Sequence, residues 1–360
     1  MVKTRPGQHE ARTRYAADVA AGLGHFFEPR RDTCVWCGSG ELRLRVVTRD
    51  HVQGKPGRFT LDECAGCGHV FQNPRLSPAG LDYYYRDAYD GYAATLSQAF
   101  TLPSLVYMLS WRLNRGRVAL VASAGCQPRA WLDIGAGYGH LCAKARGYFP
   151  DAVFDGLDNS GGIEDAQRRG WVRRALRGQF LDLSEQLDGC YDVVSMIHYL
   201  EHTRDPFAEI AAARRVLAPG GLLLIEVPNP DFWLSRVLGE WWGGWLAPQH
   251  LHLMPPRNLV SALRERGFAP VRVELGAANM PNDLTVAVIG VANSLAPDPR
   301  LPWHSAARMR QRLWRRRAVM TATLPPASLA LLTDHLVHLW TRRGHGGNAY
   351  RVLAQKTGQG

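Results

Sequence analysis

The sequence predicts an α/β protein in which a small cysteine-rich module precedes a larger, mostly parallel sheet. Two Cys-x-x-Cys pairs occur within the first seventy residues, and a glycine-rich loop follows a short apolar run at 130–134. From there to residue 230, apolar strand-like runs alternate with helical patterns, which is typical of a parallel sheet. With 360 residues and 46% hydrophobic content, the chain is long enough for one large and one small domain.

The two cysteine pairs have the spacing of a structural zinc site. Between them, residues 42–50 and 57–64 alternate apolar and polar side chains, as the strands of a hairpin do. Four thiolates fill a tetrahedral zinc shell and leave no position for a reacting water, so we expect a structural Zn²⁺ in a zinc-ribbon-like module. The alternatives are disulfides, which suit oxidising compartments, and a redox pair. The candidate metal ligands are Cys34, Cys37, Cys64 and Cys67.

A glycine-rich loop, Gly135-x-Gly137-x-Gly139, joins the apolar run at 130–134 to a helical pattern. Glycines at such a junction let the backbone approach a ligand where a Cβ atom would collide. The dinucleotide pattern G-x-G-x-x-G does not fit, because a histidine occupies its third glycine position. The other known pattern places an acidic residue two positions before the first glycine, and Asp133 fits it.

Four further segments follow the loop in a fixed order. Residues 154–160 indicate a second strand that ends at Asp158, and residues 174–183 indicate a third strand with its exit. Residues 191–206 and 214–230 indicate the fourth and fifth strands with their flanking turns. Taken together with the loop, these segments resemble the class I methyltransferases, which use S-adenosylmethionine.

The resemblance implies a role for each of these loops. The glycine loop would wrap the amino-acid part of S-adenosyl-L-methionine, and the carboxylate after the second strand would accept hydrogen bonds from the ribose hydroxyls. At the third strand many relatives carry Gly-Asp-Phe, whose Asp contacts the adenine amine; here Gln179 replaces it, and Asp182 is a second candidate. The implied cofactor-binding residues are Asp133, Gly135, Ala136, Gly137, Gly139, Asp158, Asn159, Gln179 and Asp182.

The resemblance also implies the complete fold, an α/β Rossmann-like seven-stranded sheet. Residues 270–275 would form the sixth strand. Residues 349–356 would form a final antiparallel strand, inserted between the fifth and sixth. The predicted domains are an extension at 1–30, the zinc-binding module at 31–75, a helical cap at 76–125, the methyltransferase domain at 126–276 and 346–360, and a helical insertion at 277–345.

The acceptor site is expected near residues 228–268, which resemble a segment of bacterial methyltransferases that carry an N-terminal zinc module. The segment follows the fifth strand at its carboxyl end, where open α/β sheets bind ligands. Its tryptophans are expected either to line an acceptor pocket or to pack against the zinc module. They are Trp241, Trp242 and Trp245.

Two histidines are candidate catalytic bases. Methyl transfer to a hydroxyl needs alignment of the reactants and a group that takes up the proton. His198 follows the fourth strand, His250 lies in the acceptor segment, and histidine titrates near neutral pH. A hydrogen-bonded structural histidine is the alternative for each of them.

The insertion at 277–345 is longer than a hairpin between the last two strands requires. Residues 308–317 are strongly basic, and residues 324–344 place leucines at helical spacing, with Pro326 suited to a helix start. We expect a helix packed on the main domain with a solvated basic face. The alternative is peripheral contact with an anionic membrane surface through residues 308–344.

The expected function is S-adenosylmethionine-dependent methyl transfer to a small-molecule, sugar or glycan, lipid-linked or secondary-metabolite acceptor. Deoxysugar C-methyltransferases share this combination of modules but usually continue into a further domain, so O-methylation is expected. The rivals are an RNA methyltransferase and a non-catalytic scaffold. Nucleic acid is not the expected partner, because the net charge of +11 comes almost entirely from arginine, a bias that codon usage produces.

The location expected from the sequence is cytoplasmic, or at most peripheral to a membrane. The first residues contain no continuous apolar stretch of the kind that a secretory signal requires, and no run of eighteen apolar residues follows. The sequence does not indicate an oligomeric state.

Overall fold

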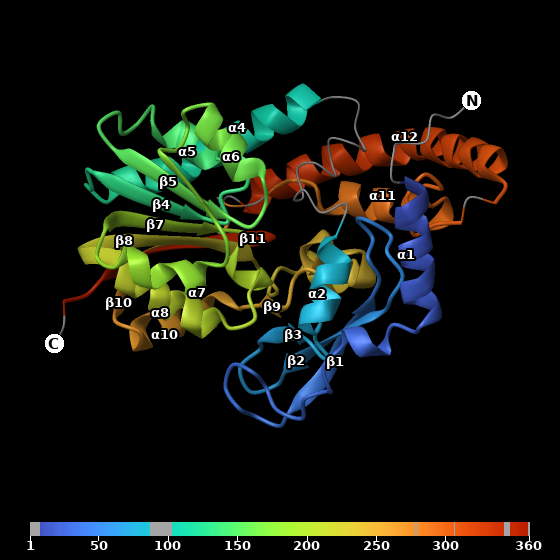
Figure 1. Ribbon diagram of the computed structural model, residues 1–360, viewed down its shortest axis with the longest axis horizontal. Coiled ribbons are helices and arrows are strands. Elements are labelled where there is room, and N and C mark those ends of the chain that lie inside the picture. Colours follow the sequence, from blue (N-terminus) through green and yellow to red (C-terminus); the bar gives the residue numbers. More distant parts are fainter. Residues whose placement is uncertain are drawn as a thin grey trace. The chain divides into compact units, whose positions relative to one another are not determined.

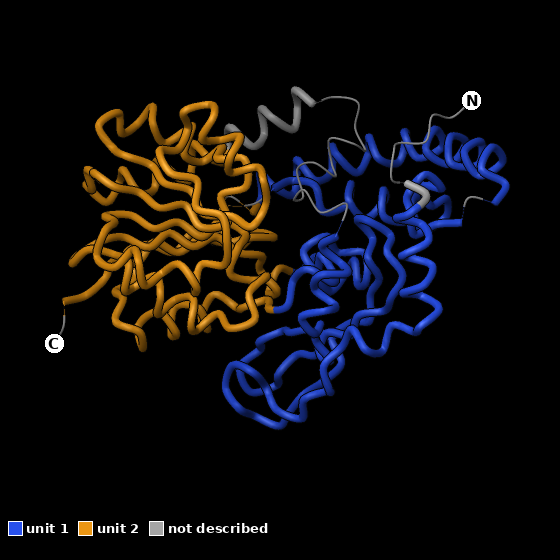
Figure 2. Tube along the Cα trace, viewed as in Figure 1, with its two compact units in different colours: residues 1–89, 233–251, 280–340 blue, residues 90–232, 252–279, 341–360 orange. Residues whose placement is uncertain are grey.

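The computed structural model describes residues 8–86, 103–276, 278, 280–305, 307–341 and 346–358. The chain forms two compact units (Figure 2), each assembled from segments that are far apart in the sequence. Unit 1 comprises residues 1–89, 233–251 and 280–340, and unit 2 comprises residues 90–232, 252–279 and 341–360.

Unit 2 is built around a seven-stranded sheet whose strand order is β10-β11-β8-β7-β4-β5-β6 (Figure 1). The central strands are parallel, whereas β11 runs antiparallel between β8 and β10. This order confirms the predicted seven-stranded fold, including the final strand inserted between the fifth and sixth. The strands are β4 (Ala130–Ile134), β5 (Val153–Asp158), β6 (Arg174–Arg177), β7 (Tyr191–Ile197), β8 (Leu217–Pro228), β10 (Phe268–Glu274) and β11 (Ala349–Lys356).

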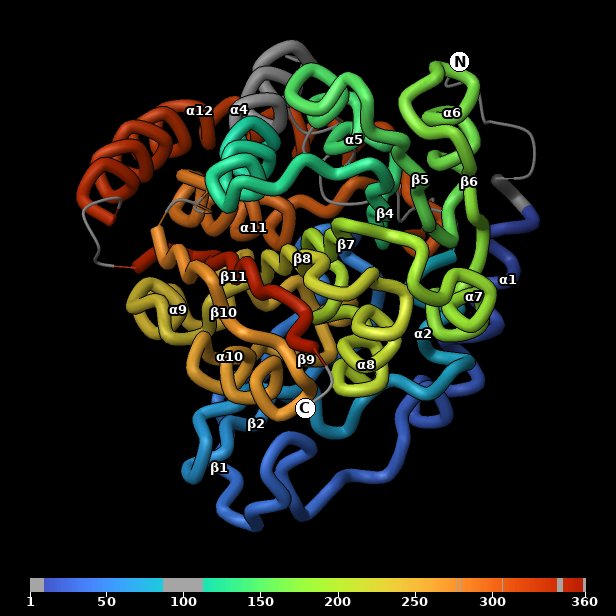
Figure 3. Tube along the Cα trace, turned by 90° about the vertical axis from the view of Figure 1, so that its left-hand side faces the viewer, coloured from blue at the N-terminus to red at the C-terminus, as the bar shows by residue number. Residues whose placement is uncertain are grey.

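Helices cover both faces of this sheet, so its central strands are mostly apolar. Figures 1 and 3 show α4, α5 and α6 over one face and α8 and α10 over the other. Trp131, Val193 and Leu224, from three neighbouring strands, are fully buried in the core beneath the first group. The helices are α4 (Pro103–Ser123), α5 (His140–Ala145), α6 (Gly162–Arg168), α7 (Phe180–Leu183), α8 (Pro206–Val216) and α10 (Pro256–Glu265).

Unit 1 contains the cysteine module. Strands β1 (Leu42–Thr48) and β2 (Phe59–Cys64) pair antiparallel, as the alternating pattern predicts, and β3 (Val70–Gln72) pairs with β2. Helix α2 (Pro78–Tyr85) begins at an N-cap, Ser77, whose side chain accepts a hydrogen bond from the backbone of Gly80. The remaining short elements are α1 (Gln8–Ala20), β9 (His252–Leu253) and α9 (Leu234–Val237), of which β9 belongs to unit 2.

Two antiparallel helices, α11 (Asp283–Leu295) and α12 (Met309–Trp340), complete unit 1 (Figure 1). The prediction that a helix begins at Pro326 is wrong, because α12 runs continuously through Pro325 and Pro326. A proline has no N–H to donate to the carbonyl one turn earlier, but its fixed φ is compatible with an α-helix. Ser328 Oγ donates to the Leu324 carbonyl at 2.9 Å, a bond to the preceding turn that often accompanies a bend in a helix.

The acceptor segment begins in unit 1. Residues 233–251, which the sequence analysis places within the 126–276 domain, pack with the cysteine module and α11 instead. Trp242 is buried and its Nε1–H donates to Asp283 at 2.8 Å, while the Arg45 guanidinium lies over the Trp245 ring. These contacts correspond to the packing alternative for the tryptophans. Residues 87–102, within the predicted helical cap at 76–125, lie outside the described residues.

Candidate functional site

The three glycines of the loop after β4 all have left-handed backbones, with φ of 71°, 53° and 71° at Gly135, Gly137 and Gly139. Two of them leave no room for a side chain: a Cβ at Gly135 would lie 2.8 Å from the Tyr199 ring, and one at Gly139 would lie 2.6 Å from Ala166. A Cβ at Gly137 would meet no atom within 4 Å. The middle of the loop is therefore the part that borders open space.

Asp158, at the end of β5, is joined directly to this loop. Its Oδ2 accepts a hydrogen bond from the Gly137 N–H at 2.8 Å, and its Oδ1 accepts one from the Ser160 N–H at 2.7 Å. Each carboxylate oxygen can accept a second bond, so the side chain keeps capacity for a ligand's hydroxyls. The structure thus brings together two elements that the sequence analysis assigned to one cofactor.

Asp133 has a different environment from Asp158. It is buried at the end of β4, its Oδ1 accepts a hydrogen bond from Ser195 Oγ at 2.6 Å, and Ser195 in turn accepts one from Trp131 Nε1 at 2.8 Å. Burial raises the pKa of Asp133 to about 7. This carboxyl group, two residues before the first glycine of the loop, ties β4 to β7 through Ser195.

The residues predicted to contact adenine lie on short elements beyond β6. Gln179 is the residue before α7, and Asp182 lies within that helix; both side chains are exposed. Ala136 lies in the glycine loop, and Asn159 is exposed between Asp158 and Ser160. No hydrogen bond described here connects Gln179 or Asp182 to the loop, so the geometry does not choose between them.

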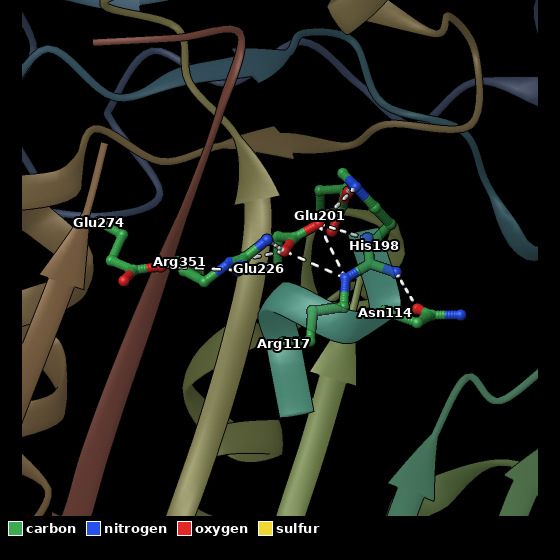
Figure 4. Close-up of polar contacts among 7 residues, drawn as sticks. All are labelled: Asn114, Arg117, His198, Glu201, Glu226, Glu274 and Arg351. Atoms are coloured by element: carbon green, nitrogen blue, oxygen red, sulfur yellow. Dashed lines mark hydrogen bonds and ion pairs between the residues drawn. The ribbon is translucent and has the colours of Figure 1, made fainter. Parts of the chain in front are cut away.

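A buried ionic cluster occupies the carboxyl end of β8, next to the loop after β7 (Figure 4). Glu226 is fully buried, and its carboxylate accepts from Arg117 Nε at 3.1 Å and from Arg351 Nε at 2.9 Å. Arg351 also lies 3.5 Å from Glu274, its partner across β10 and β11. Burial opposes ionisation of Glu226, but these cations hold its pKa well below the usual range.

His198 belongs to the same cluster (Figure 4). Its Nδ1 lies 3.2 Å from Glu201 and its Nε2 lies 3.3 Å from Glu226. Burial alone would lower its pKa, but the two carboxylates outweigh that effect and raise the pKa to about 9. Both ring nitrogens therefore carry protons at neutral pH, and a protonated imidazole cannot take up another proton. This position suits a fixed cation better than the predicted base.

His250, the other predicted base, lies in unit 1 and is buried. Its Nδ1 lies 2.9 Å from the carbonyl oxygen of Gly244. A carbonyl only accepts, so Nδ1 must carry the hydrogen, and the lone pair of the neutral ring is then on Nε2. The tautomer is therefore one that can accept a proton at Nε2.

The four cysteines of unit 1 converge on one point, with their sulfur atoms all within 4.8 Å of one another. Cys34 Sγ and Cys67 Sγ are 3.7 Å apart, and Cys37 Sγ and Cys64 Sγ are 3.6 Å apart. A disulfide would require about 2.05 Å. Tetrahedral zinc with Zn–S bonds of about 2.3 Å separates its sulfur atoms by about 3.8 Å, which these distances match.

The four thiols of the cluster differ in acidity. Burial raises the pKa of Cys34, and it raises the pKa of Cys67 to about 11. Burial acts in the same direction at Cys64, but hydrogen bonds from the Cys67 backbone and from Cys37 outweigh it and lower the pKa of Cys64 to about 7. Without a positive ion Cys34 and Cys67 stay protonated at neutral pH, whereas zinc binds thiolates and deprotonates its ligands. The geometry and the chemistry of the donors therefore both fit a structural zinc ion.

The ionic cluster around Glu226 was not anticipated in the sequence analysis. The signal that was available is a single charge inside an otherwise apolar strand. Glu226 follows Leu222–Ile225 in β8, and Arg351 interrupts Ala349–Ala354 in β11. Such a buried charge is stable only when a group of opposite charge lies beside it. The partner cannot be named before the order and register of the strands are known.

Comparison with known proteins agrees with the fold of unit 2. Residues 110–273 match the family model described as a methyltransferase domain. A ubiquinone biosynthesis O-methyltransferase of Maricaulis maris is 29% identical over 160 residues, which are 42% of this chain and 62% of the relative. The corresponding enzyme of Cereibacter sphaeroides is 34% identical over 88 residues, 22% of this chain and 35% of the relative.

Among solved structures, an S-adenosylmethionine-dependent methyltransferase from Archaeoglobus fulgidus aligns with a TM-score of 0.40 and 16% identity, over 68% of this chain and 94% of that protein. The chain covers less than two thirds of the length of each of the two curated relatives. The residues that match the family model, 110–273, contain β4 to β8 and nearly all of β10 of the unit 2 sheet, and they also contain residues 233–251 of unit 1. The cysteine module precedes this segment, and α11, α12 and β11 follow it.

Proposed function

We propose that this chain, which carries a class I S-adenosylmethionine-dependent methyltransferase domain, is an enzyme that methylates an oxygen atom of a small-molecule, glycan, secondary-metabolite or lipid-linked acceptor. The observation that carries the proposal is the bond from the Gly137 N–H to Asp158 at the carboxyl ends of β4 and β5. This bond holds Asp158, the carboxylate that we propose binds the ribose, beside the one glycine of the loop that borders open space. The O-methyltransferase relatives support oxygen as the acceptor atom.

The chain's own residues would bind and orient the reactants. Asp158 would accept hydrogen bonds from the ribose hydroxyls, and the backbone around Gly137 would lie against the amino-acid part of the cofactor. Bound S-adenosylmethionine supplies an electrophilic methyl group on a sulfonium. The acceptor oxygen would take this methyl group while the sulfur leaves with the electron pair of the sulfur–carbon bond, and a base of this chain would take up the proton of the acceptor hydroxyl.

The two histidines would have different roles. His250 donates its Nδ1–H to the Gly244 carbonyl, so Nε2 is the nitrogen that would take up a proton, whereas His198 is held protonated by Glu201 and Glu226. His198 lies one residue before Tyr199, whose ring packs against Gly135. We assign to the positively charged His198 a role in positioning the glycine loop, and to His250 the uptake of the proton.

The cysteine module would hold a structural zinc ion. All four positions of a tetrahedral shell are filled by thiolates, so the ion would stabilise the hairpin of β1 and β2 without taking part in methyl transfer. The four ligands would be Cys34, Cys37, Cys64 and Cys67.

The test is transfer of a radiolabelled methyl group from S-adenosylmethionine into a fractionated cell extract. Polar metabolites, lipids, RNA and protein are counted separately. We expect label in the metabolite or lipid fraction, in a linkage with the stability of a methyl ether or ester. Asp158→Ala should abolish the transfer, and Asp151→Ala, the same change at an exposed carboxylate outside the loop, should not.

Each outcome decides a part of the proposal. Label in RNA would replace the small-molecule acceptor with a nucleic acid, and label on carbon would overturn O-methylation. If the protein binds S-adenosylmethionine in a calorimeter but no fraction is labelled, the non-catalytic scaffold becomes the better explanation. If it does not bind S-adenosylmethionine, the assignment of the loop fails.

A further inference from the structure

One buried carboxylate determines which way α12 faces. Asp334 lies on α12 and accepts hydrogen bonds from the backbone N–H groups of Leu284 and Thr285, each at 2.9 Å, and from the Thr285 hydroxyl at 2.8 Å. These groups form the first turn of α11, where a negative charge is favourable. The bonds fix the rotation of α12 about its own axis, so the side opposite Asp334 must face outward.

The outward side of the second half of α12 is apolar. Successive residues of an α-helix are about 100° apart, so Leu332 and Leu336, two positions before and after Asp334, lie on the opposite side. The inward side carries small or polar residues, and Ala330 and Asp334 are buried. This is the reverse of the usual arrangement for a helix on a protein surface. The exposed large apolar residues are Leu324, Leu329, Leu331, Leu332, Leu336, Leu339 and Trp340.

The first half of α12 adds an aromatic side chain and positive charge to the same side. Trp314 is 67% exposed and lies eighteen residues before Leu332, about five turns of an ideal helix. Arg310 and Arg317 are four residues before it and three after it, so they flank it on the helix surface. Arg317 lies over the Trp314 ring at 5.5 Å.

The charges of α12 are almost all positive, and the positive ones lie in its first three turns. The helix contains five arginines, and its single acidic residue, Asp334, is buried against α11. Arg315 and Arg316 donate to the carbonyls of Leu295 and Ala296 at the end of α11. Arg312 is exposed and donates to the Ser305 carbonyl at 3.0 Å, and Arg310 and Arg317 are exposed to solvent. The exposed apolar strip of α12 continues into the cationic first turns of the helix. Such a face is complementary to a surface whose outer layer is anionic and whose interior is apolar.

We propose that the outward face of α12 lies in the plane of an anionic lipid bilayer. The leucines and Trp314 insert at the headgroup boundary, and the exposed arginines pair with lipid phosphates. The helix lies on the bilayer and does not cross it. Within the described part of the chain, no helix combines the length and apolarity needed to span a membrane. The proposal is independent of methyl transfer, since it rests on α11 and α12 alone.

Co-sedimentation of the full chain with sucrose-loaded vesicles tests this proposal. We expect binding to vesicles of phosphatidylglycerol and phosphatidylcholine, weaker binding to phosphatidylcholine alone, and release as salt is raised. Arg310→Glu with Arg317→Glu should lower the partition coefficient on anionic vesicles about tenfold or more. Arg43→Glu, a charge reversal at an exposed position of β1, should leave it unchanged.

The apolar contribution has its own pair of variants. Leu332→Asp should lower binding about tenfold. Leu44→Asp is the control, because Leu44 is 64% exposed on β1 and Leu332 is 59% exposed. Trp314→Ser tests the same face by a change that adds no charge, and circular dichroism verifies that each variant folds.

Three results would overturn the proposal. The first is a wild-type chain that does not sediment with anionic vesicles. The second is equal loss of binding in Leu332→Asp and Leu44→Asp. The third is concentration-dependent self-association in ultracentrifugation that Leu332→Asp abolishes while vesicles remain unbound, because the face would then be covered by a second copy of the chain.

Discussion

The three loop glycines show that identical residues in one motif are required for different reasons. At Gly135 and Gly139 the protein itself occupies the space of a side chain, through Tyr199 and Ala166. At Gly137 the space is open and the backbone N–H is bonded to Asp158. Gly137 is therefore the only one of the three at which the missing side chain leaves room for a ligand and not for another part of the protein.

Gly137→Ala should weaken S-adenosylmethionine binding about tenfold or more, because the new methyl group projects into the space assigned to the cofactor. The change also forces a non-glycine residue to a φ of 53°, which costs about 1 kcal/mol of stability. Gly189→Ala carries the same cost, at a φ of 60° and with nothing within 4 Å. Calorimetric titration should show normal affinity in Gly189→Ala. Equal affinity in both variants would contradict this placement of the cofactor.

The protonation of His198 should be visible in the pH dependence of stability. Its pKa rises from an ordinary 6.5 to about 9 on folding, so the folded state binds the extra proton between these values. Its stabilising contribution is complete below pH 6.5 and is lost as the pH rises through 9. Urea denaturation from pH 7 to 9.5 should therefore show a decline in the free energy of unfolding that is reduced in His198→Gln.

Two carboxyl groups bound the useful pH range for this measurement. Burial raises the pKa of Asp133 and of Glu209 to about 7, so their titration extends to about pH 8, and the wild type is compared with His198→Gln above that pH. A second prediction follows from the protonated state of His198. Because a protonated imidazole cannot act as a base, we expect that loss of a proton from His198 does not raise the turnover of the wild type between pH 7 and 8.5. A rate that increases through pH 9 and loses this increase in His198→Gln would restore His198 as the base.

At the scale of elements, the cysteine end of the module has only a small apolar core. Strand β1 is largely exposed or half-exposed, with Leu44 open to solvent, and the core around Cys34, Cys64 and Phe71 is small. So small a core provides little of the free energy of folding, and metal binding is the usual compensation. The metal site could be predicted from the sequence because it depends on the spacing of the cysteines, which is a local feature.

Cys37→Ser should remove most of the bound zinc and destabilise the module, since one of four ligands is lost. Cys190→Ser is the matched control, because Cys190 is also exposed but lies outside the cluster. Plasma emission spectroscopy of the purified proteins should give one zinc ion per chain for the wild type and the control. Full zinc content in Cys37→Ser would contradict the four-thiolate site.

At the scale of the whole molecule, each of the two units gathers segments that are distant in the sequence. Unit 1 takes its cysteine module from the N-terminal region and its two long helices from residues 280–340, and unit 2 receives β11 from the C-terminal region. The two expected ligands belong to different units, so each ligand should protect its own set of residues.

Hydrogen exchange followed by mass spectrometry should separate these effects. S-adenosylmethionine at about one hundred times its dissociation constant should add about 2.7 kcal/mol of stability and slow exchange around 135–139 and 158–160. Chelation of the metal should speed exchange at 34–40 and 64–69. Vesicles, in contrast, should slow exchange on α12. Protection of the cysteine module by S-adenosylmethionine alone would place the cofactor elsewhere.

Much of the fold was readable from local patterns. The loop, the strand ends and the paired cysteines are short-range features, and the resemblance to the methyltransferases supplied the strand order that they imply. The continuation of α12 through Pro325 and Pro326 was missed, because proline signals a helix start whenever its neighbours do not decide otherwise. The grouping of residues 233–251 with unit 1 was missed because it depends on contacts such as that of Trp242 with Asp283.

By itself, the sequence determined the residue types that can bind S-adenosylmethionine and zinc, since each depends on spacing over a few residues. The tertiary structure alone decided the states of those residues. The register of β8 and β11 sets Glu226 opposite Arg351, and the loop after β7 then adds His198 and fixes its charge. Likewise, only the bonds from Asp334 to α11 decide that the leucines of α12 face outward. Charge state and exposure depend on neighbours brought together by folding, which no local pattern contains.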